Sequence, residues 1–220
     1  MPTLTEKSGI HILNLGADEN RFSPDWLTAT EDILDKVVAA PAPLVTIADG
    51  MFYSNGLDLE WVTANMDQFG AYAARVEALL ARILTLPVPT VAAVNGHAFG
   101  AGAMLAMAHD WRIMRDDRGY FCFPEVDIQI PFTPGMAALI QSKLTARTAV
   151  DSMTTGHRYG GPEAGEVGIV DATAGESELL DRAIARVAAL AGKPAETLGA
   201  IKSTMFAEAA RLLRSASAPE

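Results

Sequence analysis

The sequence predicts an α/β protein whose largely parallel sheet is flanked by helices. Short runs of β-branched and apolar residues alternate along the chain with longer segments in which apolar residues recur at helical spacing. Strands that alternate with helices pair in parallel, because each helix carries the chain back to the start of the next strand. Half of the 220 residues are hydrophobic, which is enough for the core of one large domain.

The expected elements can be followed in chain order. Buried strands are expected at residues 9–15, 44–48, 90–94 and 111–115. Helices are expected at residues 23–40, 69–83, 133–144 and 180–190, with a further small-residue helix inside 95–110. Ser23 and Thr133 each precede a proline, and a capping side chain followed by proline marks the start of a helix.

An alanine-rich helical region is expected from about residue 175 onward. We therefore divide the chain into a core of residues 1–174 and a C-terminal helical region of residues 175–220. The second region suits packing on the core or on a neighbouring subunit. No internal repeat or low-complexity tract interrupts the sequence.

Charge and composition argue against several classes of partner. The formal net charge is −10, whereas nucleic acids and anionic membranes are bound by clusters of lysine and arginine. No apolar run approaches the ~20 residues of a membrane-spanning helix, and the first residues lack a signal-peptide pattern. The single cysteine, Cys122, lies between two phenylalanines, which favours packing over reactivity. We expect a cytoplasmic protein with no nucleic-acid or membrane partner.

A glycine-rich segment joins the strand at 90–94 to the helix that follows it. Gly96, Gly100 and Gly102 allow two backbone segments to approach closely, and the free N–H groups at a helix start stabilise anions. A dinucleotide-binding turn does not fit, because Leu105 stands where its last glycine belongs. A P-loop does not fit either, because no Gly-Lys-Ser/Thr sequence follows. From this segment alone, close packing and anion binding are equally supported.

Residues 120–132, YFCFPEVDIQIPF, place two carboxylates, Glu125 and Asp127, inside an otherwise almost wholly apolar run. An unpaired buried carboxylate is costly. Either both acids have structural partners, or at least one of them faces a substrate. The residues of this run leave both alternatives open.

Four motifs in a fixed order resemble those of the crotonase superfamily of enoyl-CoA hydratases and isomerases. They are ADGMFYSNGLDLEWV, VPTVAAVNGHAFGAGAMLAMAHDWRI, FPEVDIQIPFTPG and TTGHRYGGPEAGEVGIVD. The resemblance covers roughly residues 8–190 and departs from the usual pattern at Asn55, where serine or alanine is typical. It is closest to the short monofunctional Δ3-Δ2-enoyl-CoA isomerases.

The resemblance implies a fold, a substrate and an assembly. It implies a crotonase-like ββα spiral, an acyl-CoA thioester substrate, and a homotrimer or a dimer of trimers. Coenzyme A is then part of the substrate, and neither a metal nor a separate cofactor is required. The backbone N–H groups of Leu57 and Ala101 would form an oxyanion hole. Substrate-binding residues would be Ser54, Asn55, Gly56, Asp58, Gly100, Met104 and Phe132, with Asp58 holding its turn rather than reacting.

The resemblance also separates the roles of the acids. Hydratases of the superfamily use two glutamates to position and activate water, and these would fall at Met104 and Glu125. A thioether cannot exchange a proton, whereas one carboxylate is enough to carry a proton from C2 to C4 of an acyl chain. The implied activity is therefore that of an isomerase in fatty-acid metabolism, with Glu125 as catalytic base and conjugate acid. Asp127 is expected to be structural.

Other functions remain open from the sequence. A hydratase, a thioesterase or a decarboxylase could use the same scaffold, because one oxyanion hole serves many reactions. A non-catalytic acyl-CoA-binding protein is a rival of another class, and the presence of Glu125 argues against it. His97, His109 and Asp110 are expected to be structural, because no metal-binding pair or nucleophile motif accompanies them.

Overall fold

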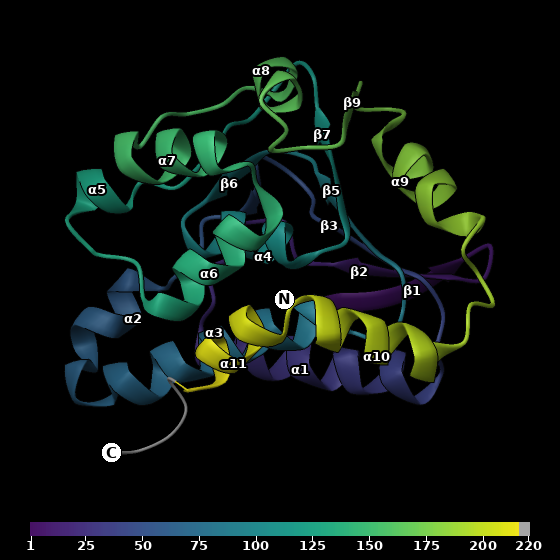
Figure 1. Cartoon of the computed structure of the whole chain (residues 1–220), viewed down its shortest axis with the longest axis horizontal. Coiled ribbons are helices and arrows are strands. Elements are labelled where there is room, and N and C mark those ends of the chain that lie inside the picture. The colour runs from purple at the N-terminus through teal and green to yellow at the C-terminus, as the bar shows by residue number, and fades with distance from the viewer. Residues whose placement is uncertain (216–220) are drawn as a thin grey trace.

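The computed structural model describes residues 1–215, and residues 216–220 of the predicted C-terminal region lie outside the described part (Figure 1). A six-stranded sheet forms the centre. Its strands, in spatial order, are β1 (Thr3–Lys7), β2 (Ile10–Asn14), β3 (Leu44–Ile47), β5 (Thr90–Val94), β7 (Trp111–Arg115) and β9 (Ala172–Ala174). The first pair is antiparallel and every following pair is parallel, which confirms the predicted largely parallel sheet.

A second, three-stranded sheet lies at the carboxyl ends of the central strands. It contains β4 (Phe52–Ser54), β6 (His97–Phe99) and β8 (Phe121–Cys122), which pair in parallel in that order. Each of these short strands directly follows a strand of the larger sheet and precedes a helix. The repeated strand–strand–helix unit is the spiral that the motifs implied.

The helices lie around the two sheets (Figure 1). Their bounds are α1 (Pro24–Ala39), α2 (Leu59–Ala64), α3 (Phe69–Leu84), α4 (Ala101–Ala108), α5 (Glu125–Ile128), α6 (Pro134–Lys143), α7 (Ala146–Thr155), α8 (Gly161–Glu166), α9 (Leu179–Ala188), α10 (Ala195–Met205) and α11 (Ala207–Ser215). A 3₁₀ turn at Met66–Gln68 joins α2 to α3. Ser23 and Thr133 accept hydrogen bonds from the N–H groups of Trp26 and Met136, which confirms both predicted caps.

The core has two parts, one on each face of the larger sheet. On one face, side chains such as Ile10, Val45 and Val91 pack against α9. On the other face, side chains such as Leu13 and Val94 join the larger cluster that includes α1, α3, α4 and α6. Because both faces of the sheet are covered, β3 (LVTI) and β5 (TVAAV) consist of apolar and β-branched residues on both faces instead of alternating with charged ones.

Two of the residues that the sequence assigned to packing are buried and partnered. The His109 imidazole is bonded to the Thr46 hydroxyl and the Leu105 carbonyl, and burial lowers its pKa to about 3. Cys122 is buried, and burial raises the pKa of its thiol to about 11. Both residues are structural, as predicted. No helix within residues 1–215 is long and apolar enough to span a membrane.

Candidate active site

A cavity of about 390 Å³ lies between the start of α3, the first turns of α4 and α6, and the segment that contains α5. We call it the Glu125 cavity. Its lining residues are mostly apolar, and they come from five segments that are separated in sequence. They are Arg21, Asn55, Leu57, Leu59, Phe69, Ala73, Phe99, Gly100, Ala101, Met104, Pro124, Glu125, Ile128, Ile130, Pro131, Thr133 and Met136.

The two glycine-bearing turns of the sequence meet at this cavity. Gly56 follows β4 with a φ of +74°, and a Cβ atom at this position would lie 2.9 Å from the backbone nitrogens of Ala101 and Gly102. Gly102 in turn leaves no room for a Cβ, which would lie 2.2 Å from the Ser54 carbonyl oxygen. Close backbone packing, one of the two alternatives for the segment with Gly96, Gly100 and Gly102, therefore holds at Gly102, and Gly56 packs as closely.

The Leu57 and Ala101 backbones line the cavity from these two turns. Ala101 is the first residue of α4, where an N–H group has no acceptor within the helix. Within the described residues, neither the Leu57 N–H nor the Ala101 N–H donates a hydrogen bond to the protein. Both groups are therefore available to a ligand oxygen, and the positive end of α4 favours negative charge beside Ala101.

Glu125 begins α5, directly after Pro124, and its side chain enters the cavity. The residue is only 7% exposed, and its Oε2 atom has no hydrogen-bond partner within residues 1–215. Burial raises the pKa of this carboxyl to about 7, and a hydrogen bond from its own backbone opposes the shift. The Oε1 atom lies 3.5 Å from the position that a Cβ at Gly100 would take. The carboxylate is thus held against the second glycine turn.

Glu125 is the one acidic residue among those that line the cavity in the described part of the chain. Met104 lies one helical turn after Gly100 on α4, is 1% exposed, and also lines the cavity. The position that would carry a second acid therefore presents a thioether. Asp127 is exposed, and its carboxylate lies against Gly156 after α7, away from the lining residues.

The structure brings together Asn55, Leu57, Gly100, Ala101, Met104 and Glu125 from the residues predicted for the site. Ser54, Gly56, Asp58 and Phe132 are not among the residues that line the cavity. The Ser54 hydroxyl donates to the Asn20 carbonyl and accepts from the Gly56 N–H. The Asp58 carboxylate caps α2 by accepting from the Trp61 N–H, and the Phe132 ring packs edge-on against Phe123.

Several lining residues were not predicted from the sequence. Phe69 and Ala73 lie one turn apart on α3, where the apolar periodicity of residues 69–83 predicted a helix but did not mark a site. Ile128 and Ile130 are exposed apolar residues that follow the Pro-Glu motif. Arg21 brings a cation to the cavity, and its guanidinium donates to the Leu57 carbonyl at 3.4 Å. No sequence pattern marked it.

The family model described as "Enoyl-CoA hydratase/isomerase" matches residues 17–220. The chain belongs to the enoyl-CoA hydratase/isomerase family. Enoyl-CoA delta isomerase 3 of Arabidopsis thaliana is 32% identical to this family member, over 97% of the chain and 95% of that protein. The peroxisomal enoyl-CoA delta isomerase 2 of the same plant is 35% identical, over 81% of the chain and 79% of that protein.

Solved structures of similar proteins share the fold of this enoyl-CoA hydratase/isomerase. A family protein from Pseudomonas syringae superposes with a TM-score of 0.92 at 23% identity, covering 98% of this chain and 94% of that one. The human mitochondrial delta3-delta2-enoyl-CoA isomerase superposes with a TM-score of 0.87 at 23% identity, covering 96% of this chain and 85% of that one. At this identity the likeness establishes the crotonase fold alone.

Proposed function

We propose that this enoyl-CoA hydratase/isomerase moves the double bond of a 3-enoyl-CoA to the 2-position, as part of fatty-acid metabolism. The observation that carries the proposal is the single carboxylate, Glu125, in an apolar cavity beside two free backbone N–H groups. Relatives named enoyl-CoA delta isomerase support it over nearly the whole chain. The reaction needs no separate cofactor, because coenzyme A is part of the substrate.

The proposed mechanism is a proton shuttle by one residue. The Glu125 carboxylate removes a proton from C2, and the electron pair of that C–H bond forms a C1–C2 double bond as the pair of the thioester C=O bond moves onto oxygen. Negative charge then develops on the thioester oxygen, where the N–H groups of Leu57 and Ala101 stabilise it by ~3–4 kcal/mol each. The Glu125 carboxyl returns its proton to C4, the C3–C4 double bond is lost, and the base is regenerated. As C4 is protonated, the C=O bond forms again and the C1–C2 pair moves to make the C2–C3 double bond.

The surroundings of Glu125 suit this role. A general base works best when its pKa lies near the working pH, and burial raises the pKa of Glu125 to about 7. Apolar walls formed by Phe69, Ile128 and Met136 suit an acyl chain and exclude water from the charged intermediate. A purely structural acid would be expected to have a hydrogen-bond or ion-pair partner, and Oε2 has none among the described residues.

Hydration of 2-enoyl-CoA is the second candidate activity, and Met104 argues against it. In the two-glutamate arrangement a second carboxylate helps to orient and activate water, but the Met104 thioether can neither accept nor donate that proton. A non-catalytic acyl-CoA-binding role is disfavoured by Glu125. Burying an unpaired carboxyl costs stability, and a protein that only bound the thioester would gain nothing from it.

The assembly and the cellular location are part of the proposal. We propose a homotrimer or a dimer of trimers, which would cover exposed apolar side chains such as Val126 on α5 and Val150 on α7. Light scattering that gives the mass of a monomer would contradict this assembly. The cytoplasm is the proposed location, although similar Arabidopsis proteins are named peroxisomal.

Replacing Glu125 with glutamine tests the proposed function directly. An amide cannot accept the C2 proton, so Glu125→Gln should reduce conversion of 3-enoyl-CoA to 2-enoyl-CoA to background, while binding of the thioester persists through backbone donors. Asp127→Asn is the matched control, because this exposed acid lies outside the cavity, and its rate should equal that of the wild type. Undiminished isomerase activity in Glu125→Gln would refute the proposal.

A further inference from the structure

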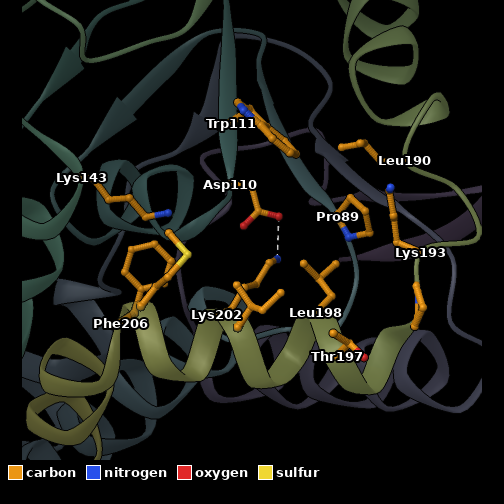
Figure 2. Close-up of a pocket in the computed structure, with 13 residues that line it drawn as sticks. Pro89, Asp110, Trp111, Lys143, Leu190, Lys193, Thr197, Leu198, Lys202 and Phe206 are labelled. Atoms are coloured by element: carbon orange, nitrogen blue, oxygen red, sulfur yellow. Dashed lines mark ion pairs between the residues drawn. The ribbon is translucent and has the colours of Figure 1, made fainter.

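A second cavity, of about 470 Å³, lies between α10 and the amino ends of β5 and β7 (Figure 2). We call it the α10 pocket. It shares no lining residue with the Glu125 cavity. The Glu125 cavity is built on the glycine turns at the carboxyl ends of the central strands, so the two cavities lie at opposite ends of the sheet. The proposed isomerisation therefore does not account for this pocket.

Apolar side chains form most of the wall of the α10 pocket. The Trp111 ring forms one wall, Leu198 of α10 faces it, and Phe206 closes one end (Figure 2). The outer face of the Trp111 ring is covered by the Arg186 guanidinium, 4.0 Å from the ring centroid. A cavity of this size with apolar walls and few polar groups has the character of a small-molecule site.

Lys202 and Asp110 form an ion pair at the floor of the pocket. The Lys202 ammonium is 2.5 Å from Asp110 Oδ2 and also donates to the Val88 carbonyl oxygen at 2.7 Å. Asp110 Oδ2 accepts a second hydrogen bond, from the Thr90 N–H. Lys202 is only 4% exposed, so both charges are compensated inside the protein. This pair holds α10 against the sheet, and it confirms the structural role expected for Asp110.

Lys143 brings a second cation into the pocket without a carboxylate partner. Its ammonium donates to the His109 carbonyl oxygen at 3.0 Å and lies 4.2 Å from the centroid of the Phe206 ring. Within residues 1–215, no carboxylate oxygen lies within ion-pair distance of it. Burial and the nearby cations Arg112 and Lys202 lower the pKa of Lys143 to about 8, and the more distant carboxylates of Asp110 and Asp171 oppose this shift in part. Lys143 therefore has hydrogen-bonding capacity and positive charge left for a ligand.

The charge of the pocket contrasts with that of the whole protein. Three lysines and one aspartate line it, while the chain carries a net charge of −10. The third lysine, Lys193, lies in the segment between α9 and α10, is exposed, and forms no ion pair in the described part of the chain. A ligand that complements this site needs one negative group for Lys143 and an apolar body for the walls.

We propose that the α10 pocket binds a small amphipathic anion, a carboxylate with an aliphatic body, and that the carboxylate pairs with Lys143. Inorganic phosphate alone would leave the apolar walls unfilled, and a neutral hydrocarbon would give Lys143 no ion pair. The inference does not depend on the proposed isomerase activity, because no residue is shared between the two sites.

Decanoate is a suitable probe, and its binding to the full-length protein can be measured by isothermal titration calorimetry. Lys143→Met should weaken binding at least ~10-fold, as expected for one hydrogen bond to a charged group. Lys143→Arg keeps a cation that can pair with the carboxylate, so its binding should stay within ~3-fold of the wild type. Lys36→Met, at an exposed position on α1, is the matched control and should bind as the wild type does. Decanol, which has the same aliphatic body without the charge, should bind at least ~10-fold more weakly.

A second pair of variants separates the two cavities. Thr197→Phe fills the α10 pocket and should abolish decanoate binding. Ala73→Phe narrows the Glu125 cavity and should leave decanoate binding unchanged. The proposal is overturned if Ala73→Phe removes binding and Thr197→Phe does not, or if Lys143→Met binds as tightly as Lys36→Met. Absence of decanoate binding to the wild type would also overturn it, and would fit a pocket covered by a second copy of the chain.

Discussion

A Cβ atom added to Gly56 would lie 2.9 Å from the backbone nitrogen of Ala101. This contact ties the first glycine turn to the second, and with it the two N–H groups that we propose to hold the thioester oxygen. The position of one proposed donor therefore depends on the absence of a side chain beside the other. The φ of Gly56, +74°, adds a second reason for glycine here.

Gly56→Ala should consequently disable the oxyanion hole. The added methyl group forces the turns apart, and losing an aligned donor costs a factor of ~100–1,000 in kcat. Steady-state conversion of 3-enoyl-CoA measures this loss. Gly165→Ala is the matched control, because a Cβ at this position in α8 meets nothing within 4 Å, and its kcat should be unchanged. Equal kcat values in the two variants would show that catalysis does not depend on the close packing of the two glycine turns.

The rate should depend on pH through Glu125. A base must be ionised to accept a proton, and burial raises the pKa of Glu125 to about 7. We expect kcat/KM to rise tenfold per pH unit below about pH 7 and to level off above it, because kcat/KM reports the free enzyme. A profile that is flat from about pH 5 upward would mean that the reacting group is not this carboxyl, since an unshifted glutamate titrates near ~4.3.

Met104 gives a way to move that profile. Met104→Glu places a second carboxylate in the same cavity, and like charges disfavour ionisation, so the pKa of Glu125 should rise further. The midpoint of the kcat/KM profile should then shift to higher pH. Met104→Gln, which is polar and uncharged at the same position, should leave the midpoint near that of the wild type. A shift of the same size in both variants would point to polarity or packing rather than charge.

Glu77 on α3 should limit the stability of the fold at neutral and alkaline pH. The residue is 1% exposed, neither carboxylate oxygen has a hydrogen-bond partner within residues 1–215, and burial raises its pKa, partly offset by the nearby Thr133 hydroxyl. A carboxyl whose pKa is higher in the folded state binds its proton more tightly there. Its contribution to stability is therefore lost as the pH rises from the unfolded-state value through the folded-state value.

Glu77→Gln removes the ionisable group and should raise the free energy of unfolding by about 1 kcal/mol at pH 8. The gain should shrink toward pH 4, where the wild-type carboxyl is protonated in the folded state and mostly protonated in the unfolded state. Urea denaturation at the two pH values measures it, with Glu166→Gln, at an exposed position on α8, as the control. A gain that is the same at both pH values would contradict the assignment to ionisation.

The central strands and the long helices could be predicted from the sequence, because burial on both faces leaves a local pattern. β3 and β5 are runs of apolar and β-branched residues, and α3 has a regular apolar stripe. The strands of the smaller sheet could not be predicted in the same way. β8 has two residues and β4 has three, which is too few for an alternation to be recognised.

The candidate site was predictable where a motif fixes the backbone and was not predictable where side chains gather from distant segments. Glu125 and Met104 were found at motif positions, and both line the cavity. Arg21 and Ile128 also line the cavity, but tertiary packing rather than a local sequence pattern places them there. Phe132 lies next to the lining residue Pro131, but its ring packs on Phe123, and nothing in the sequence tells these two neighbours apart.

The central claim is that Glu125 alone catalyses isomerisation of the double bond. Hydration should be slow because Met104 stands where a second carboxylate would activate water. The most direct test is a side-by-side assay in which wild-type protein is offered 3-enoyl-CoA and 2-enoyl-CoA of the same chain length. We predict measurable isomerisation of the first, with hydration of the second slower by at least ~100-fold, the scale of one positioned acid–base group. Efficient hydration of 2-enoyl-CoA by the wild type would contradict the claim, because Glu125 alone or another group would then be activating water.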